Sequence, residues 1–217
     1  MRRLLDAVST LAALAAIVIA WTALKARSGP VVQAIGEPVP FRGWSKYEPG
    51  GHLIGNANAK VRLVEFGDYE CPACRGKQPW IAAVLQEFGP RLALEYRYLP
   101  IPYHRAAYPA ARAAECAAAQ GRFSEFHGQL WKQDAWLTNT GQEFPKMARA
   151  AGIADIAAFE KCIQLDEPVP AVEADIQLAH EIGVPGTPTL VLDGTDLSSV
   201  DSIGLVEAIS GYLASRR

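Results

Sequence analysis

The chain has little cysteine, almost no net charge and no apparent internal repeat. Its 217 residues include four cysteines, and 21 basic residues offset 23 acidic ones to a formal net charge of −2. The basic residues are scattered and no Gly-rich phosphate loop is present, which argues against a nucleic-acid-binding protein. Half of the residues are hydrophobic, which excludes a disordered chain. The length suits one domain, or one domain that carries an insertion.

The sequence also lacks the ligand spacing of a metal site. Structural zinc is held by four ligands, usually two Cys pairs or one pair with closely spaced histidines. Cys71 and Cys74 are the only close pair, and the histidines are far apart in the sequence. A hydrolase is not indicated, because no Gly-x-Ser-x-Gly motif accompanies His104 or His127. We predict no metal and no bound cofactor, and we interpret these two histidines as helix-end or core-edge residues.

The N-terminal segment, residues 1–27, differs from the rest of the chain. Two arginines precede an apolar run from Leu4 to Leu24. As an α-helix this run would be roughly 31 Å long, whereas the apolar core of a cleaved signal is usually about 7–15 residues. We predict a signal anchor, with a cleaved signal and a secreted protein as the alternative, since Ala26 and Ser28 offer small residues for cleavage. Both interpretations place the remaining chain in an oxidising space outside the cytoplasm, such as the periplasm.

The rest of the chain predicts an α/β fold. Residues 28–58 are rich in Gly and Pro and are predicted to be a tether leading into the fold, with a short strand near 31–35. The stretches KVRLVEFGDY and RLALEYRYLP are predicted strands, and the first has apolar residues on both faces. A helix is predicted between them, beginning at Pro72 and ending at Gly89.

Helical patterns dominate the second half of the chain. They are predicted at 106–119, 123–132, 142–151, 155–164 and 169–182. TPTLVLDG then predicts a buried strand, another short strand is expected near 197–200, and a helix at 202–215 closes the chain. The order indicates an α/β domain over 59–217, with an all-helical insertion at about 104–183.

Cys71 and Cys74 lie where the first strand passes into a helix. A static bridge across two residues would add little stability, because the entropic effect of a disulfide grows with the loop that it closes. At a helix start, free N–H groups and the positive end of the helix dipole favour a thiolate. We interpret the pair as a redox couple. Cys71 would be the exposed attacking sulfur with a lowered pKa, and Cys74 the buried sulfur that resolves a mixed disulfide.

Two motifs together resemble the DsbA-like branch of the thioredoxin superfamily. LVEFGDYECPAC and GVPGTPTLVLDG carry the resemblance, which covers roughly 55–194. It implies a thioredoxin-like fold with the helical block inserted before the strand that follows a cis-proline. It also implies that Thr187 and Pro188 form the cis-proline loop opposite the cysteines, next to Pro72 and Ala73 of the active-site motif. Such a loop would let an extended substrate pair as an added strand.

Glu65 is the third element of this candidate site. It lies six positions before Cys71 on the predicted buried strand, where the family carries an acidic residue beneath the active site. A carboxyl buried there would have a raised pKa and could relay a proton to or from Cys74. The alternative is a glutamate at a solvated strand end.

The remaining cysteines, Cys116 and Cys162, fall in helical patterns of the insertion. Buried free thiols are one interpretation, because unpaired cysteine packs as a small hydrophobe. In an exported protein we expect instead a structural disulfide, since these two are the only intramolecular partners left once Cys71 and Cys74 are paired. Some actinobacterial-type DsbA-like proteins have a comparable second disulfide, so the resemblance agrees.

These observations predict an exported thiol:disulfide oxidoreductase anchored in the cell membrane. We expect an oxidase that passes the Cys71–Cys74 disulfide to reduced exported proteins. The family implies reoxidation by a membrane partner of the DsbB or vitamin-K-epoxide-reductase (VKOR) type. Two alternatives remain: a reductase or isomerase, for example in cytochrome c maturation, and a non-catalytic thioredoxin-like binding module. Oxidase and reductase differ in redox potential, which the motif leaves open.

Overall fold

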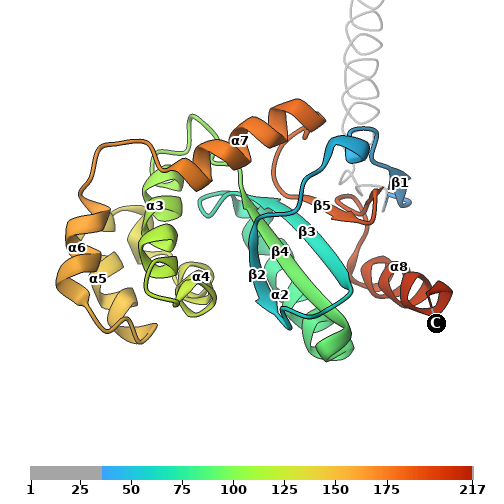
Figure 1. Ribbon diagram of the computed structural model, residues 1–217, viewed down its shortest axis with the longest axis horizontal. Coiled ribbons are helices and arrows are strands. Elements are labelled where there is room, and N and C mark those ends of the chain that lie inside the picture. Colours follow the sequence, from blue (N-terminus) through green and yellow to red (C-terminus); the bar gives the residue numbers. More distant parts are fainter. Residues whose placement is uncertain (1–35, 217) are drawn as a thin grey trace, which may run out of the picture. The chain divides into compact units, whose positions relative to one another are not determined.

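The computed structural model describes residues 36–216 of the chain (Figure 1). The strands form one six-stranded sheet in the order β1-β6-β5-β3-β4-β2. They are β1 (Val39–Pro40), β2 (His52–Gly55), β3 (Val61–Gly67), β4 (Leu92–Tyr98), β5 (Thr189–Leu192) and β6 (Thr195–Asp196). The α-helices are α2 (Pro72–Phe88), α3 (Ala107–Ala118), α4 (Phe123–Lys132), α5 (Thr140–Ala150), α6 (Ile156–Ile163), α7 (Pro170–Ile182) and α8 (Ser202–Ser215). Short 3-10 helices are η1 (Trp44–Lys46), η2 (Gly89–Arg91) and η3 (Ala135–Leu137).

Strand β3 lies inside the sheet and leads directly to the cysteine pair. It runs parallel to β4 and antiparallel to β5. Every residue of β3 except Arg62 is buried. Because successive side chains of a strand point to opposite faces, burial of both Leu63 and Val64 means that both faces are covered. The prediction of a strand buried on both faces is confirmed.

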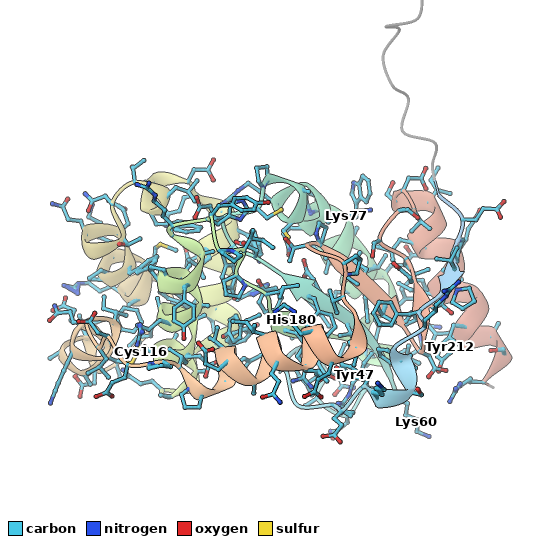
Figure 2. The ribbon with its side chains drawn as sticks, turned by 90° about the horizontal axis from the view of Figure 1, so that it is seen from above. Tyr47, Lys60, Lys77, Cys116, His180 and Tyr212 are labelled. Atoms are coloured by element: carbon cyan, nitrogen blue, oxygen red, sulfur yellow. A yellow bond between two sulfur atoms is a disulfide. The ribbon has the colours of Figure 1, made fainter. Side chains whose placement is uncertain are left out.

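Different helices cover the two faces of the sheet. On one face, which we call the α2 face, Leu63 packs with leucines of β4 and β5 against α2 and α8. On the other, the α7 face, Val64 and Val191 pack against α7 and η1. Figure 2 shows Lys77 of α2 and His180 of α7 on opposite sides of the sheet. Each fully buried Leu or Val side chain contributes about 1.5–3 kcal/mol to folding.

The helical insertion lies between β4 and β5. Helices α3 to α6 gather at one end of the sheet, and α7 returns from this group across the sheet (Figure 1). The helix predicted at 106–119 is α3, and most of its many alanines are buried. Small side chains let α4 and α6 pack closely on α3. The α/β core with an all-helical insertion is therefore confirmed.

Two boundaries differ from the sequence prediction. The segment predicted to be a tether already belongs to the fold from Gly36 onward, because β1 pairs with β6 and β2 pairs with β4. The folded unit thus begins before residue 59. The short strand expected near 197–200 is instead β6 at Thr195–Asp196. The Leu197 N–H still donates to the Leu190 carbonyl (2.8 Å), but the ladder ends there because the Ser198 hydroxyl, in place of a backbone carbonyl, accepts the Leu190 N–H (2.9 Å).

The predicted signal anchor over 1–27 and the strand expected near 31–35 lie outside the described residues. Within 36–216, no helix is both long and apolar enough to cross a membrane.

Candidate active site

Cys71 is the N-cap of α2, and Cys74 lies one turn further into the same helix. The Cys71 N–H donates to the Asp68 carbonyl (3.1 Å), which closes the turn between β3 and the helix. Pro72 occupies the first helical position, where the missing N–H costs no hydrogen bond. Cys71 is 8% exposed and Cys74 is fully buried, while Pro72 and Ala73 are exposed. The sulfur that was expected to be exposed is thus largely covered, although Cys71 remains the cysteine of the pair that solvent or a substrate can reach.

The two thiols differ in acidity. The Cys74 thiol donates to the Cys71 sulfur and lowers the pKa of Cys71 to about 5, against the opposing effect of burial. The N–H groups of Cys74 and Ala73 and the hydroxyl of Thr187 act in the same direction. The same hydrogen bond, with burial and the nearby Glu65, raises the pKa of Cys74 far above its ordinary value. Both sulfurs are unbonded, so the structure is that of the reduced pair.

The loop before β5 faces Cys71, although 116 residues separate the two in the sequence. The Thr187–Pro188 peptide bond is cis. The Thr187 carbonyl lies 3.6 Å from the Cys71 sulfur and accepts its hydrogen when the thiol is protonated. The loop is held from within by the Thr189 hydroxyl, which donates to the Gly186 carbonyl (2.7 Å). The structure thus brings together Cys71, Thr187 and Pro188.

Glu65 lies on the α2 face of β3 and is completely buried. The alternative of a solvated strand end is therefore wrong. Gln78 of α2 donates to one carboxylate oxygen (2.9 Å), and the other oxygen has no hydrogen-bond partner. Burial raises the pKa of Glu65 to about 8, against the lowering effect of Gln78 and with a further rise from Cys71. Glu65 is thus a neutral acid near neutral pH, close enough to Cys74 to raise the pKa of that thiol.

Gln78 was missed in the sequence, although its spacing could have identified it. It follows Cys74 by four positions, which places it one helical turn further on the same buried side of α2. A polar residue on the buried side of a helix needs a partner, and Glu65 is the buried acceptor on the strand beneath.

Gly67 ends β3 where the backbone passes over an aromatic ring. A Cβ atom at this position would lie 2.6 Å from the ring of Tyr96 and 2.9 Å from its hydroxyl oxygen. Only glycine avoids this clash, so the close approach of Tyr96 beneath the active-site loop requires Gly67.

Asp68 shapes the turn that presents the cysteines. Its carboxylate accepts the N–H of Glu70 (2.7 Å), the N–H of Ile101 (2.8 Å) and the Nδ1–H of His104 (2.7 Å). Glu70 in turn accepts the Ala106 N–H (2.6 Å). These contacts give Asp68 and Glu70 a turn-forming role, and they place His104 at the edge of the core, as predicted.

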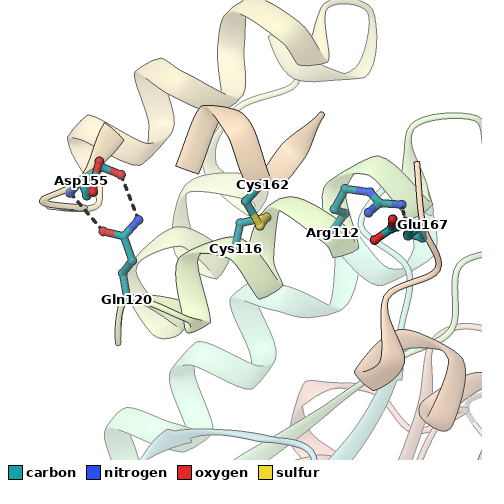
Figure 3. Close-up of a disulfide and its surroundings, with 6 residues drawn as sticks. All are labelled: Arg112, Cys116, Gln120, Asp155, Cys162 and Glu167. Carbon is teal, nitrogen blue, oxygen red and sulfur yellow. Dashed lines mark hydrogen bonds between the residues drawn. A yellow bond between two sulfur atoms is a disulfide. The ribbon is translucent and has the colours of Figure 1, made fainter. Parts of the chain in front are cut away.

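The second cysteine pair forms a disulfide that joins α3 to α6 (Figure 3). Cys116 and Cys162 are 46 residues apart in the chain, and their Cα atoms are 5.9 Å apart. A hydrogen bond from Arg112 to the Glu167 carbonyl (2.7 Å) lies on one side of the bridge. A reciprocal pair between Gln120 and Asp155 lies on the other. The chain is therefore fastened on both sides of the bridge.

The second of the two histidines considered above, His127, and two tryptophans have structural positions. His127 is buried between Tyr69 and Trp131, and burial lowers its pKa to about 3. Trp136 is fully buried in the insertion, whereas Trp80 is half-buried beneath Lys77. Among residues 36–216, no three His, Cys, Asp or Glu side chains gather as metal ligands would.

A groove of about 620 Å³ adjoins the cis-proline loop. Its walls come from the loop after β4, from α7 and from the segment before Thr187, including Gly186. His104, which bonds to Asp68, also lines it. The groove therefore reaches the segment before the cis-proline through Gly186. Its lining combines Leu, Ile, Pro and Val side chains with Arg105, Glu173 and two histidines.

Fold and cysteine pair together define a thioredoxin-like protein, and the family comparison agrees. A family model described as Thioredoxin matches residues 47–210. The chain therefore belongs to the thioredoxin family. DsbA2 of Pseudomonas aeruginosa is 30% identical with a TM-score of 0.61, over 76% of this chain and 96% of that one. A thioredoxin-like oxidoreductase of Silicibacter pomeroyi is 29% identical with a TM-score of 0.63, over 80% and 98%.

Further likenesses extend this picture. BdbD of Bacillus subtilis shares the fold, with a TM-score of 0.68 at 21% identity, over 82% of this chain and all of that one. The resemblance to DsbA-like thiol:disulfide oxidoreductases is confirmed. The Na(+)/H(+) antiporter NhaA 1 of Mycolicibacterium gilvum is 33% identical over 162 residues, which are 73% of this chain and 26% of the antiporter. The chain thus spans about a quarter of the length of this curated relative.

Proposed function

We propose that this protein is an extracytoplasmic disulfide oxidase that transfers the Cys71–Cys74 disulfide to reduced exported proteins. The observation that carries the proposal is the polarised thiol pair, in which Cys71 ionises with a pKa of about 5 and Cys74 is held protonated. Such a pair has one sulfur that leaves readily as a thiolate and a second, buried thiol that can resolve a mixed disulfide.

The low pKa of Cys71 supports the oxidising direction. A stabilised thiolate stabilises the reduced form of the pair, and a stable reduced form makes the disulfide a stronger oxidant. The thiolate of thioredoxin, a reductase, has a pKa of about 7, and that of DsbA, an oxidase, about 3.5. The value of about 5 for Cys71 lies between them, on the acidic side of thioredoxin.

The proposed transfer proceeds through a mixed disulfide. A substrate thiolate attacks the Cys71 sulfur of the oxidised pair, the bond between Cys71 and Cys74 breaks, and Cys74 leaves as a thiolate that takes up a proton. A second substrate thiolate then attacks the substrate sulfur, and Cys71 leaves as a thiolate. The substrate loses two electrons and gains a disulfide, and the pair gains both electrons. Thr187 and Pro188 would hold the extended substrate beside Cys71, with Pro72 and Ala73 forming the exposed turn next to it.

Glu65 is placed to supply the proton that Cys74 needs. The acid is neutral near pH 7 because its pKa is raised to about 8. When Cys74 leaves as a buried thiolate, a neutral carboxyl nearby can protonate it and then regain a proton on reoxidation. We therefore assign Glu65 as the proton relay of the site.

The proposal also includes how the cysteine pair is reoxidised and where the domain is held. A membrane partner of the DsbB or VKOR type would accept the two electrons, so the chain itself needs no bound cofactor. The segment over 1–27 would hold the domain at the outer side of the cell membrane, where reduced exported proteins emerge.

The test is the equilibrium of the Cys71–Cys74 pair against glutathione buffers, with the state of Cys116 and Cys162 followed separately by mass spectrometry. We expect a pair more oxidising than thioredoxin. A Cys74→Ser variant whose Cys71 is first converted to its mixed disulfide with glutathione should capture a reduced peptide on Cys71 and release glutathione. A pair as reducing as thioredoxin would contradict the oxidase assignment and indicate a reductase. If Cys71→Ser oxidised reduced peptide no more slowly than the parent, the Cys71–Cys74 pair would not be the oxidant, and the alternative of a non-catalytic binding module would be favoured.

A further inference from the structure

A buried chain of hydrogen bonds runs from the helical insertion to the active-site loop. His127 of α4 is 5% exposed, and both of its ring nitrogens have partners. The indole N–H of Trp131 lies 3.0 Å from Nε2, and the hydroxyl of Tyr69 lies 2.9 Å from Nδ1. Among residues 36–216, His127 is the one histidine that uses both ring nitrogens to link the insertion to the loop before Cys71.

The direction of each hydrogen bond follows from donor chemistry. An indole N–H can only donate, so Nε2 of His127 must be an unprotonated acceptor. A neutral imidazole then carries its single proton on Nδ1, which donates to the Tyr69 oxygen. Trp131 thus fixes the tautomer of His127, and the tautomer fixes which way the bond to Tyr69 points.

Tyr69 carries this constraint to the cysteine pair, because it precedes Cys71 by two positions in the turn after β3. Its ring is 1% exposed and stacks on Tyr96 with 5.2 Å between ring centroids. Its oxygen is the acceptor for His127. The ring face of Tyr69 is therefore held by Tyr96 and its hydroxyl by His127. These contacts restrict the conformation of the backbone that leads to Cys71.

The insertion also contacts the helix that follows Cys74. Arg75 of α2 donates to the Trp131 carbonyl (2.7 Å) and pairs with Asp134 (2.9 Å). Trp131 thus holds the backbone on both sides of the cysteine pair, directly through Arg75 and through His127 at Tyr69.

We propose that His127 and Trp131 are positioning residues, which hold the turn before Cys71 through Tyr69 and thereby set the rate of disulfide exchange at that sulfur. The helical insertion then acts on the chemistry of the site besides covering it. The proposal rests on the proposed exchange at Cys71. It adds a task for residues that touch neither the substrate nor the reacting sulfurs.

Matched variants separate positioning from general stability. His127→Phe keeps a buried ring but loses both bonds, whereas His127→Asn keeps a donor near the place of Nδ1. Tyr69→Phe removes only the acceptor oxygen. Trp136→Phe is the control. This indole also donates within the insertion, to the Leu130 carbonyl (3.0 Å), which Arg75 approaches only at 3.5 Å, and it forms no hydrogen bond with His127 or Tyr69 among residues 36–216.

The readouts are the exchange rate of the oxidised protein with a cysteine peptide and the pH profile of Cys71 alkylation in the reduced protein. We expect His127→Phe and Tyr69→Phe each to slow exchange about tenfold, the effect of one well-placed hydrogen bond, and the double variant to be no slower. The apparent pKa of Cys71 should rise in both by about one unit, because the turn no longer holds the sulfur against the N–H groups of the helix. His127→Asn should recover most of the rate, and Trp136→Phe should leave both readouts unchanged.

Several results would overturn the positioning role. A ¹⁵N spectrum with the proton of His127 on Nε2 would contradict the bond directions. A His127→Phe protein with the rate and pH profile of the parent would refute the proposal. So would an equal loss in Trp136→Phe, which would indicate general destabilisation. If His127→Phe does not fold, Tyr69→Phe carries the same test. A parent that exchanges no disulfide would refute the proposed function, whereas an active parent with unaffected variants refutes only the positioning role.

Discussion

Two buried glutamates on neighbouring strands have opposite environments. Glu65 of β3 is fully buried on the α2 face, and Glu95 of β4 is 1% exposed on the α7 face. One oxygen of Glu95 accepts the Tyr47 hydroxyl (2.7 Å) and the N–H groups of Gly50 (2.8 Å) and Gly51 (2.9 Å). Tyr47 lies on the far side of the sheet from α2 (Figure 2). Glu65 has a single donor, and one of its oxygens has none.

Charge increases the contrast. Arg97 lies 3.2 Å from Glu95 and also pairs with Asp175 (2.7 Å), and Arg62 reaches the second oxygen of Glu95 (3.3 Å). Burial opposes ionisation of Glu95, but the two glycine N–H groups, Tyr47 and Arg97 outweigh it and lower its pKa. Burial acts on Glu65 without such compensation and raises its pKa to about 8.

The difference shows that burial alone does not make an acid reactive. A carboxylate surrounded by donors is a fixed anion that ties segments together, here the loop at Gly50 and the strand β4. A carboxyl with one donor stays protonated and can exchange its proton. The polar residues of the α7 face thus stabilise the fold, and the one on the α2 face is available for chemistry.

The largest expected effect is on stability. Glu95→Ala should lower the free energy of unfolding by about 3 kcal/mol, because the Tyr47 hydroxyl and the N–H groups of Gly50 and Gly51 lose their acceptor and the ion pair with Arg97 is lost. Glu65→Ala should cost less than half as much, since only Gln78 loses a partner. Urea unfolding of the parent and both variants at pH 7 measures the two values.

The same pair of variants separates stability from exchange. Folded Glu95→Ala should retain the rate of peptide oxidation of the parent, whereas Glu65→Ala should be slower at the step that protonates Cys74. Equal losses of stability would show that the two faces do not differ as described. A Glu95→Ala protein that oxidises peptide more slowly than the parent would show that the α7 face also contributes to catalysis.

How far the sequence predicts this contrast depends on what each pattern encodes. The burial of Glu65 could be predicted, because apolar neighbours on both parities of KVRLVEF leave no solvated face. The partners of Glu95 could not be predicted in the same way. Two of them are the N–H groups of Gly50 and Gly51, in a segment whose Gly and Pro content indicated a tether. Local composition marks turns, but it does not show which distant strand a turn will contact.

The residues of the candidate site also fall into two groups: those with a local sequence motif and those placed by long-range packing. The cysteine pair and the cis-proline loop have local motifs, so Cys71, Thr187 and Pro188 could be named from the sequence. Gln78 and the contact of His127 with Tyr69 depend on long-range packing of helices against the sheet. From the sequence alone, a histidine or glutamine in a helical pattern cannot be distinguished from an ordinary surface or core residue.

The next effect is the pH dependence of stability, which should have opposite signs for the two acids. Between the unfolded value of 4.5 and the folded value of about 8, folded Glu65 binds more protons than the unfolded chain. It therefore lowers the free energy of unfolding by about 1.4 kcal/mol for each unit that the pH rises in this window. Glu95, whose pKa is lowered, stabilises the fold above its unfolded pKa, and this contribution is lost on acidification through its folded pKa.

The slope is measured as a difference between the reduced parent and Glu65→Gln, from urea unfolding at pH 5, 6, 7 and 8. The difference is necessary because Cys71, with its lowered pKa, titrates in the same range with the opposite sign. Parallel stability curves for the two proteins would mean that Glu65 is ionised in the fold. A Glu95→Gln protein whose curve departs from that of the parent only at acid pH completes the comparison.

The smallest expected effect concerns the one donor that Glu65 has. Gln78→Leu should raise the pKa of Glu65 further, by about half a unit to one unit, because the bond from Gln78 favours the ionised carboxylate. A ¹³C titration of the Glu65 carboxyl measures the shift directly. Arg62→Gln is the matched control, since Arg62 contacts Glu95 on the other face and should leave the titration of Glu65 unchanged. An unchanged titration in Gln78→Leu, or an equal shift in Arg62→Gln, would show that the acidity of Glu65 is not governed by its own partner on α2.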